Sequence, residues 1–592
     1  MFRGFAVLPD DERARDVPAV LAWPDAHVLY HDSGRPWLVG DWTPEEILDA
    51  RSGAARVVVL GHCPWDAARL AGLAARVRSV ADLDLLVRAL PGSAHVVAAV
   101  AGRVRVQGSA SGLRRVFHAR RDGITVAADR ADVLARLTGA AVDDDVLAAQ
   151  LTSVVLPPPV GEWTPWRGVR ALPPDRCLLL EPEGTHTEAV WWRPPEPVRK
   201  LSAGADRVRS ALETAVASPS DGRVSADLSG GFDSTSLCFL AARTHPDLLT
   251  ARFTGADAAN EDAHFAALAA AHLPGAEHWA VPPGAGPSRY ADIGAAVDPE
   301  QPVVFGRESA LVRWRASALA ASGSRCHLAG HGADEIFHAP HAYLHPLARR
   351  RPLVAWRHLR AHRAARRWSW RAIAGELADR GDLADWWTDA ANGLTGPPPR
   401  PSAPLLGWGL PLRAPAWLTA DALASARRTF HTVAESVRPL AADRAGHLTL
   451  AAIRTSAPQY RLLARLHEAN GVPLRLPFLD DRVVEAALAV RPEDRASPWR
   501  YKPVLAEAMA GIVPAPILDR RTKGDFTADT RAGFRRHLPA LLSLFEESRL
   551  ADRGLIDPGR LRATLLAPQR DNSALFLFDS TLAAELWLRS VS

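Results

Sequence analysis

The sequence predicts an α/β protein of two domains, and three observations lead to this prediction. A chain of 592 residues is too long for one ordinary hydrophobic core. The first part of the chain alternates short apolar runs with turn residues, which indicates a strand-rich domain. From about residue 205 onward, strand and helix patterns alternate, which indicates a parallel sheet with helices on both faces.

The first domain is expected to consist mainly of β-sheets. Strand patterns occur in ARVVVLGH, HVVAAVAGRVRVQG, GITVAADR and RCLLLEPEG, and DLDLLVRAL has a helical pattern. The segment WWRPPEPVRK, residues 191–200, is rich in proline and charge and precedes a new helical pattern. We therefore place the boundary there, with the first domain at residues 1–195 and the second at 200–592.

The second domain is expected to be a doubly wound parallel sheet with a helical extension. The strand patterns RVSADLS, LLTARFTG, EHWAVP and RCHLAG alternate with helical patterns such as STSLCFLAARTH and ALVRWRASALAASG. In such a sheet, ligands bind beyond the carboxyl ends of the strands. After residue 340 the pattern is mostly helical, interrupted by the proline-rich residues 396–404, so we expect helical insertions around 340–450.

Composition excludes several classes of protein. No segment approaches the roughly 20 consecutive apolar residues of a membrane span, and the start of the chain turns acidic after one short apolar run. A net charge of +5 is small for this length and gives no reason to infer a nucleic-acid partner. We expect a reduced, cytoplasmic protein without membrane contact or structural zinc, because the cysteines lie far apart: Cys63, Cys177, Cys238 and Cys326.

The segment SGGFDS, residues 229–234, follows one predicted strand and opens a helix. Such a turn presents unpaired backbone N–H groups and the positive end of the helix dipole, so it binds anions. Its glycines allow close approach of a phosphate, and Ser229, Ser234 and Thr235 add hydroxyl donors. The carboxylate of Asp233 would repel a phosphate unless a divalent cation lay between them, which indicates an Mg²⁺ ligand. The alternative is an ordinary glycine-rich turn.

A second glycine-rich turn follows another predicted strand. The segment LAGHGADEIF, residues 328–337, contains the carboxylates Asp334 and Glu335. Two such turns in one parallel sheet would bring Asp233 and Asp334 together around one or two metal ions. The alternative for Asp334 is a cap at a helix N-terminus.

These segments resemble the motifs of the asparagine synthetase class of ATP pyrophosphatases, the PP-loop enzymes. SGGFDS resembles their pyrophosphate loop and GHGADE their second metal-binding loop. Residues 471–488, GVPLRLPFLDDRVVEAAL, are similar to their Arg-x-Pro-Phe-Leu-Asp motif, and residues 501–526 contain Lys-x-x-Leu and Arg-x-Lys-x-x-Phe-like elements. The N-terminal region resembles the family's Ntn-type glutamine amidotransferase domain, in which β-sheets are sandwiched between helices.

The resemblance implies that the second domain activates a carboxylate with ATP and Mg²⁺, and that an amine then displaces AMP to form an amide. Asp233 and Asp334 would bind Mg²⁺ and share the catalytic role with Lys523, whose cation would face the α-phosphate. Without the flanking motif, Lys523 would be interpreted as a surface lysine. The resemblance assigns the nucleotide to Leu228, Ser229, Gly230, Gly231, Asp233, Ser234, Gly330 and Gly332.

Three positions depart from the family pattern. Phe2 stands where the amidotransferase half carries its nucleophilic cysteine, so we do not expect glutamine hydrolysis. Pro473 replaces a glutamate that takes part in general-base chemistry in the β-lactam-forming branch, so that role is vacant or moved. His331 replaces the glutamate of a Gly-Glu-Gly segment; it would act as a base or pack against the phosphate loop, and we favour packing.

An inactive amidotransferase half, an intact ATP-activating half and a helical extension together resemble the lasso peptide cyclases. These macrolactam synthetases adenylate an Asp or Glu side chain of a ribosomal precursor peptide, and the peptide's own N-terminal amine closes the ring. The expected partners are the precursor peptide and, as further candidates, a leader-binding protein and a leader peptidase. Two alternatives stay open: a small-molecule amide synthetase of the β-lactam or asparagine type, and a catalytically inactive ATP-binding scaffold.

The arginine-rich residues 349–371, RRRPLVAWRHLRAHRAARRWSWR, contain no acidic residue. Arg360, Arg363, Arg367 and Arg371 fall at spacings that share one face of a helix. This pattern indicates either a surface that binds acidic parts of a peptide or protein, or a solvated face whose charges form intramolecular ion pairs.

Overall fold

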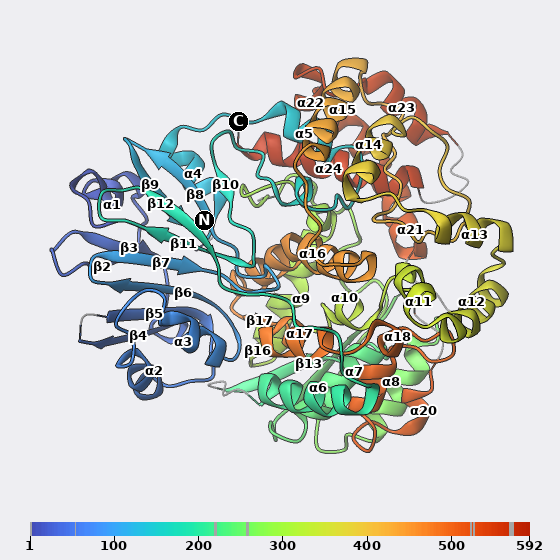
Figure 1. The fold of residues 1–592 in the computed structure, drawn as a ribbon, viewed down its shortest axis with the longest axis horizontal. Helices are drawn as coiled ribbons and strands as arrows, with labels where there is room; N and C mark the ends of the chain where they lie inside the picture. The colour runs from blue at the N-terminus through green and yellow to red at the C-terminus, as the bar shows by residue number, and fades with distance from the viewer. Residues whose placement is uncertain are drawn as a thin grey trace.

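The computed structural model describes residues 3–53, 55–217, 222–255, 260–295, 297–520, 524, 527–567 and 573–591. The N-terminal part contains two six-stranded antiparallel sheets, coloured blue to teal in Figure 1. The first has the order β10-β8-β9-β1-β3-β2 and the second the order β12-β11-β7-β6-β5-β4. The first sheet contains β1 (Phe5–Val7), β2 (His27–Tyr30), β3 (Pro36–Gly40), β8 (Phe117–Arg121), β9 (Ile124–Ala128) and β10 (Arg170–Ala171). The second contains β4 (Ile47–Ser52), β5 (Ala55–His62), β6 (Ser93–Val100), β7 (Arg103–Gln107), β11 (Arg176–Leu180) and β12 (His186–Val190).

Helices cover the outer faces of both sheets. Along β5, Val58 and Leu60 point into the core shared by the two sheets, whereas Val57 and Val59 pack under helices, as the period of two in a strand requires. The first sheet is covered by α1 (Val17–Leu21) and α4 (Ala131–Thr138), and the second by α2 (Ala67–Ala74) and α3 (Leu83–Ala89). These four layers confirm the predicted sandwich of sheets between helices.

The second part of the chain is built on a five-stranded parallel sheet with the order β15-β14-β13-β16-β17. Its strands are β13 (Arg223–Asp227), β14 (Leu249–Phe253), β15 (Glu277–Val281), β16 (Ser324–Leu328) and β17 (Leu474–Arg475). The helices α6 (Leu201–Val216), α7 (Phe232–Ala241), α8 (Asp262–Ala271) and α17 (Asp481–Leu488) pack on one face, and α9 (Ser309–Ala321) and α16 (Arg444–Glu468) on the other. The strand order reverses between β13 and β16, which is where such folds bind ligands. The predicted doubly wound sheet is confirmed.

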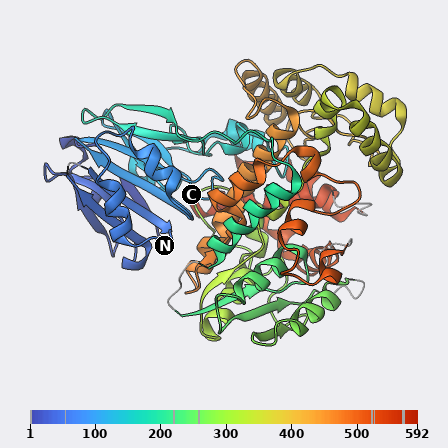
Figure 2. The ribbon, with the colours of Figure 1, turned by 60° about the horizontal axis from the view of Figure 1, so that its bottom comes forward.

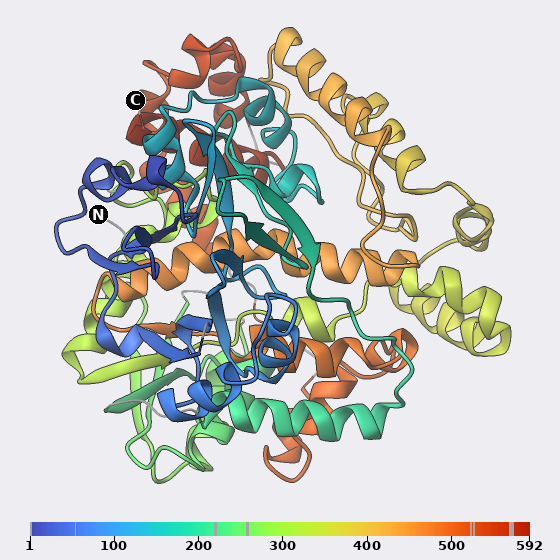
Figure 3. The same cartoon turned by 60° about the vertical axis from the view of Figure 1, so that its left-hand side comes forward.

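The remaining helices form the helical extension and the C-terminal region. The extension lies at the right of Figure 1, and α16 crosses the middle of the molecule in Figure 3. These helices are α5 (Asp144–Gln150), α10 (Ala333–Phe337), α11 (Leu344–Arg350), α12 (Pro352–Arg366), α13 (Trp370–Ala378), α14 (Leu383–Asn392), α15 (Ala420–Ala434), α18 (Pro492–Arg495), α19 (Pro503–Ala508), α20 (Ala515–Leu518), α21 (Thr527–Leu544), α22 (Arg549–Asp552), α23 (Pro558–Leu566) and α24 (Ser573–Val591). Among the described residues, no helix is long and apolar enough to cross a membrane.

The arginine-rich stretch is not one helix, which corrects our expectation. It is divided among α11, α12 and α13. Arg367 ends α12 in the left-handed conformation with φ 56°, and Ser369 then caps α13 by accepting a hydrogen bond from the Ala372 N–H at 3.1 Å. Of the arginines expected on one face, only Arg360 and Arg363 therefore belong to the same helix.

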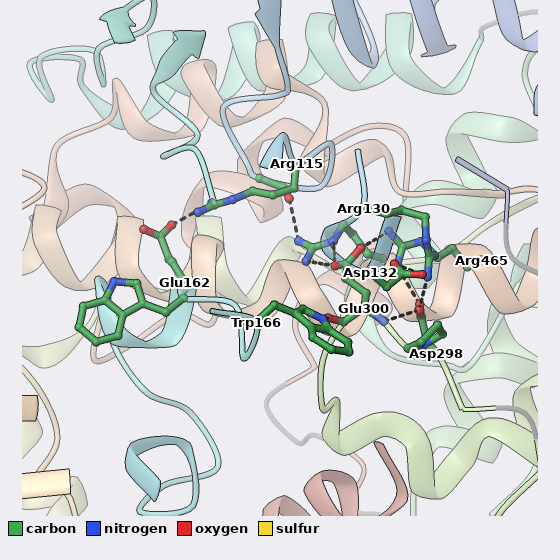
Figure 4. Close-up of polar contacts among 12 residues, drawn as sticks. Arg115, Arg130, Asp132, Glu162, Trp166, Asp298, Glu300 and Arg465 are labelled. Atoms are coloured by element: carbon green, nitrogen blue, oxygen red, sulfur yellow. Dashed lines mark hydrogen bonds and ion pairs between the residues drawn. The ribbon is translucent and has the colours of Figure 1, made fainter. Parts of the chain in front are cut away.

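In the ribbon of Figure 2, the N-terminal sandwich lies beside the orange helix α16. A buried ion-pair network joins the two, and Figure 4 shows its side chains. Arg130 pairs with Asp298 at 2.6 Å, and Arg465 pairs with Asp298 at 2.7 Å and with Glu300 at 2.5 Å. Arg461 approaches Glu300 to 2.6 Å. Charges buried this deeply are tolerated only when each has an opposite partner, so the network holds α16 in place against the first sheet.

Candidate functional site

A cavity of about 730 Å³ lies at the carboxyl ends of the parallel strands. This is the place where the fold predicts a ligand, and the volume lies within the usual range of small-molecule sites. Residues of α9, α16, α21 and α24 and of the segment 282–289 also line it. From the ends of the strands it is lined by Asp227, Ser229, Phe253, Val281, Ala329 and Leu474.

The phosphate-loop candidate, residues 229–234, turns from β13 into α7. Gly230 has a φ of 88°, and a Cβ there would collide with the carbonyl oxygen of Asp262, so only glycine fits. The hydroxyls of Ser229 and Ser234 are 2.8 Å apart, and the Gly231 N–H donates to Ser229 Oγ at 3.1 Å. The loop therefore holds its shape by its own hydrogen bonds, and it opens a helix whose first-turn N–H groups lack intrahelical acceptors.

Two further observations show how this loop is shaped for an anion. The Thr235 hydroxyl is fully buried, and it has no hydrogen-bond partner among the described residues. Leu228 donates its backbone N–H to the Ala251 carbonyl at 2.8 Å, which fixes the start of the loop to β14. A buried donor in the first turn of a helix that starts at such a loop is suited to an oxyanion.

The second loop packs directly against the first. A Cβ on Gly330 would lie 2.9 Å from the backbone nitrogen of Ser234, so a larger residue would separate the two loops. Gly332 is the N-cap residue of α10, and Asp334 lies in the first turn of that helix. The two predicted loops thus meet at the point where the strand order reverses.

Lys502 connects the two loops. Its Nζ lies 2.6 Å from both carboxylate oxygens of Asp233 and 2.8 Å from Oδ1 of Asp334. Its side chain is 0 % exposed, and the Tyr501 hydroxyl also donates to Oδ1 of Asp334 at 3.1 Å. Lys502 adopts a left-handed backbone conformation with φ 40° as the N-cap residue of α19, directly before Pro503. An unfavourable backbone conformation is thus retained where a buried ammonium meets two carboxylates.

Asp233 and Asp334 are suited to an Mg²⁺ ion. Because both carboxylates approach the same Nζ, their oxygens converge on one point, and carboxylate oxygens are ligands that Mg²⁺ prefers. No group of three or more His, Cys, Asp or Glu side chains arranged for a metal occurs in the described part of the chain. Two carboxylates suffice for Mg²⁺, which usually takes its other ligands from water and substrate phosphates.

Sequence reasoning noted the Lys-x-x-Leu element that contains Lys502 but gave this lysine no role, and it selected Lys523, which lies outside the described residues, as does Phe2. A signal for Lys502 was present, because the chain contains only three lysines, Lys200, Lys502 and Lys523, among 71 basic residues. Lysine is a compact point charge, whereas arginine is a planar fork. A lysine in a chain that otherwise uses arginine therefore indicates a position that requires an ammonium group.

Arg520 supports the phosphate loop from outside the cavity lining. Its guanidinium donates to the Gly230 carbonyl at 2.6 Å and to Asp262 at 2.6 Å, and it lies 4.5 Å from the ring centroid of Phe265. Its side chain is only 3 % exposed. Arg520 therefore fixes the loop backbone, and no sequence motif singled it out.

Three histidines line the cavity: His327, His331 and His467. The ring of His331 packs 5.2 Å from that of Tyr460, whose hydroxyl donates to Glu335 Oε1 at 2.6 Å, and burial lowers the pKa of His331. His327 Nε2 contacts Asp227 at 3.2 Å. Burial tends to raise the pKa of Asp227, but His327 outweighs it and lowers that pKa below the ordinary value. Asp227 therefore faces the cavity as an ionised carboxylate, which sequence reasoning did not identify.

The third motif, residues 471–488, has a different role from that of the two loops. Asp480 accepts a hydrogen bond from the Gly92 N–H at 2.9 Å, and Asp481 accepts one from the Ala110 N–H at 2.9 Å. Both donors belong to the N-terminal sandwich. Pro473 offers only its carbonyl, which accepts from the His327 N–H at 3.0 Å. This motif thus attaches the two parts of the chain to each other, and the position of the family glutamate carries no base.

Comparison with known proteins adds the family. A search of solved structures found the glutamine phosphoribosylpyrophosphate (PRPP) amidotransferase from B. subtilis complexed with ADP and GMP, at 11% identity and a TM-score of 0.23 over 55% of this chain and 80% of that chain. It also found a structure of the allosteric regulatory enzyme of purine biosynthesis, at 12% identity and a TM-score of 0.22 over the same shares, 55% and 80%. TM-scores this low support no conclusion about this chain. A search of curated proteins found no match.

A family comparison matches residues 207–589 to asparagine synthase, which is more than half of the chain. The matched residues contain both loops, Lys502 and the parallel sheet. The chain therefore belongs to the asparagine synthase family, whose members form amide bonds in ATP-dependent reactions.

Proposed function

We propose that this chain is a lasso peptide cyclase. It adenylates an Asp or Glu side chain of a ribosomal precursor peptide and closes a macrolactam with the peptide's N-terminal amine, releasing AMP and pyrophosphate. The observation that carries the ATP-dependent step is the contact of Lys502 with Asp233 and Asp334 beside residues 229–234. A chain without activity would not need to keep a buried cation between two carboxylates, so this contact also speaks against an inactive scaffold.

Each group of residues in the site has its own role in the reaction. In the first step, a substrate carboxylate oxygen bonds to the α-phosphorus of ATP, and the bond to pyrophosphate breaks. Residues 229–234 hold the pyrophosphate through the first turn of α7, and Lys502 places its charge where negative charge develops. Mg²⁺ held by Asp233 and Asp334 neutralises phosphate charge when bound.

In the second step, the amine nitrogen bonds to the acyl carbon, the bond from that carbon to the AMP oxygen breaks, and the proton lost by the amine passes to water. Asp227 faces the cavity at the end of β13, two residues before Ser229. Its lowered pKa keeps it ionised, so it is our candidate for holding the incoming amine in position. Pro473 has no ionisable group, so the side chain at position 473 does not hold the incoming amine.

The proposal includes an amine that comes from the substrate and not from glutamine. An amidotransferase nucleophile requires an activated thiolate. Burial raises the pKa of every cysteine thiol of the chain, namely Cys63, Cys177, Cys238 and Cys326. None of the four is therefore suited to attack glutamine, which supports an amine supplied by the peptide itself.

The test is AMP and pyrophosphate formation by the purified protein with ATP and Mg²⁺, with and without a linear precursor peptide encoded nearby. We expect turnover only with peptide, loss of one water from the peptide mass, and loss of both in Asp233→Asn, with Lys200→Met as the control. AMP formation driven by a small amino acid would instead support a small-molecule amide synthetase. No AMP with any substrate would favour the scaffold alternative.

A further inference from the structure

An exposed surface on α12, α13 and the segment between α18 and α19 combines arginines with tryptophans. We define the Arg–Trp face by six residues: Trp356, Arg357, Arg360, Arg363, Trp370 and Trp499. All six are exposed, and the tryptophans are 51%, 37% and 54% exposed in chain order. Large aromatic side chains gathered on a surface mark an interaction site more often than single exposed apolar residues do. Helices α12 and α13, which carry most of the face, lie at the right of Figure 1.

The rings and guanidinium groups form two ordered clusters, one around Trp356 and Trp370 and one around Trp499. The rings of Trp356 and Trp370 stack at 4.7 Å with an interplanar angle of 12°. Arg363 lies 5.3 Å from the ring centroid of Trp370, and Arg357 lies 5.9 Å from that of Trp499. These contacts hold the guanidinium groups of Arg357 and Arg363 in place, so binding loses less side-chain entropy.

The arginines of the face have no intramolecular ion pairs among the described residues. Two neighbouring arginines do form ion pairs: Arg350 lies 3.7 Å from Asp443, and Arg351 lies 3.2 Å from Glu493. No such carboxylate approaches Arg357, Arg360 or Arg363 within the described part of the chain. The alternative of intramolecular ion pairs, which the sequence left open, therefore does not apply to this face.

The buried side of α12 is held by a polar cluster. The Tyr343 hydroxyl lies 2.8 Å from His358 Nδ1 and 2.9 Å from His362 Nε2. The Trp368 ring stacks on His362 at 5.7 Å. These contacts fix the buried side of helix α12, so its exposed arginines keep a constant spacing.

The face is connected to the catalytic loops by a short piece of chain. Trp499 precedes Lys502 by three residues, and three extended residues span at most about 11 Å. Between them, Tyr501 donates its hydroxyl to Asp334. A chain segment that lies on the face can therefore continue into the site where the carboxylate is activated.

We propose that the Arg–Trp face is the docking site for an acidic segment of the peptide substrate, outside the residues that form the ring. The assignment to the substrate rests on the proposed function. Guanidinium groups bind carboxylates in bidentate fashion, and uncompensated arginines complement a run of Asp and Glu. A nucleic acid fits less well, because base stacking needs open ring faces, whereas Trp370 stacks on Trp356 and is covered by Arg363.

The test is fluorescence anisotropy without ATP. The probe is a fluorescein-labelled peptide of Glu-Asp-Gly repeats, and its Gln-Asn-Gly analogue is the neutral control. The variant is Arg357→Gln/Arg360→Gln/Arg363→Gln. A matched variant, Arg76→Gln/Arg207→Gln/Arg428→Gln, removes the same charge from exposed positions on other elements. Circular dichroism checks the fold of both variants.

We expect the acidic peptide to bind the wild type at low salt, at least ten-fold weaker binding to the face variant, and a less than two-fold change in the matched variant. Binding should fall steeply as salt is raised, since screening acts within about 10 Å at 0.1 M ionic strength. Equal binding to both variants would overturn the proposal. So would tighter binding of a single-stranded oligonucleotide that is lost in the face variant.

The binding result and the proposed function can fail separately. Peptide binding that depends on the face, in a protein that never forms AMP, would leave the docking site standing and remove the cyclase assignment. Normal AMP formation with a subsaturating precursor peptide in the face variant would remove the docking site and leave the cyclase assignment standing, because activation would then not use this surface.

Discussion

Replacing Lys502 by methionine is the sharpest test of the site. The substitution Lys502→Met keeps a long, unbranched side chain and removes only the charge that lies 2.6 Å from Asp233 and 2.8 Å from Asp334. If this charge faces the developing negative charge of the reaction, its loss should slow AMP formation by about 10²–10³-fold, or roughly 2.7–4 kcal/mol, as for other preorganised donors.

The effect on folding should be smaller. Removing one partner of a fully buried ion pair costs about 3–5 kcal/mol. Here Asp334 is 48% and Asp233 20% exposed at the side chain, so water stabilises part of the uncompensated charge, and we expect a loss of only about 1–2 kcal/mol. The folded variant can therefore be assayed.

Pyrophosphate release at saturating ATP, Mg²⁺ and peptide measures the catalytic effect. Lys502→Arg should not restore the rate, because a planar guanidinium does not fit a position that is 0 % exposed. Mg²⁺ alone should raise the Tm of Lys502→Met more than that of the wild type, since the ammonium group no longer competes with the ion for the two carboxylates. The exposed Lys200→Met is the control. A folded Lys502→Met protein with a rate within three-fold of the wild type would refute the argument.

Two further predictions concern the contacts between the two parts of the chain. Glu300→Gln removes the carboxylate that pairs with Arg461 and Arg465 at a position 2% exposed. Arg465 keeps Asp298 at 2.7 Å, whereas Arg461 loses its carboxylate partner, so the free energy of unfolding in urea should fall by about 3–5 kcal/mol. Glu277→Gln at an exposed ion pair should cost less than about 1 kcal/mol, and equal losses would contradict the prediction. Burial raises the pKa of Asp480 from 3.8 to about 6, so its contribution to stability is present below pH 3.8 and is lost as the pH rises through 6. The wild type should therefore lose up to about 3 kcal/mol relative to Asp480→Asn between pH 4 and 7, and parallel pH curves would exclude this effect.

Much of the fold could be predicted because its determinants are local. The period-two burial of β5 and the alternation of strands and helices after residue 205 depend on neighbouring residues, and both appear in the structure. The two glycine-rich loops were predictable for the same reason, since a turn from strand to helix is specified within a few residues. The prediction that the arginines of residues 349–371 share one helix face was wrong, because spacing alone did not predict the turn at Arg367.

The sequence by itself determined the parallel sheet, the two loops and the presence of two acidic residues beside them. Only the tertiary structure placed Lys502, which lies 269 positions from Asp233, between those carboxylates. The contacts of Arg130 with Asp298, 168 positions apart, and of Gly92 with Asp480, 388 positions apart, were likewise decided only there. The physical reason is that local patterns specify backbone conformation, whereas the partner of a buried charge is chosen by which distant segments pack together and exclude water.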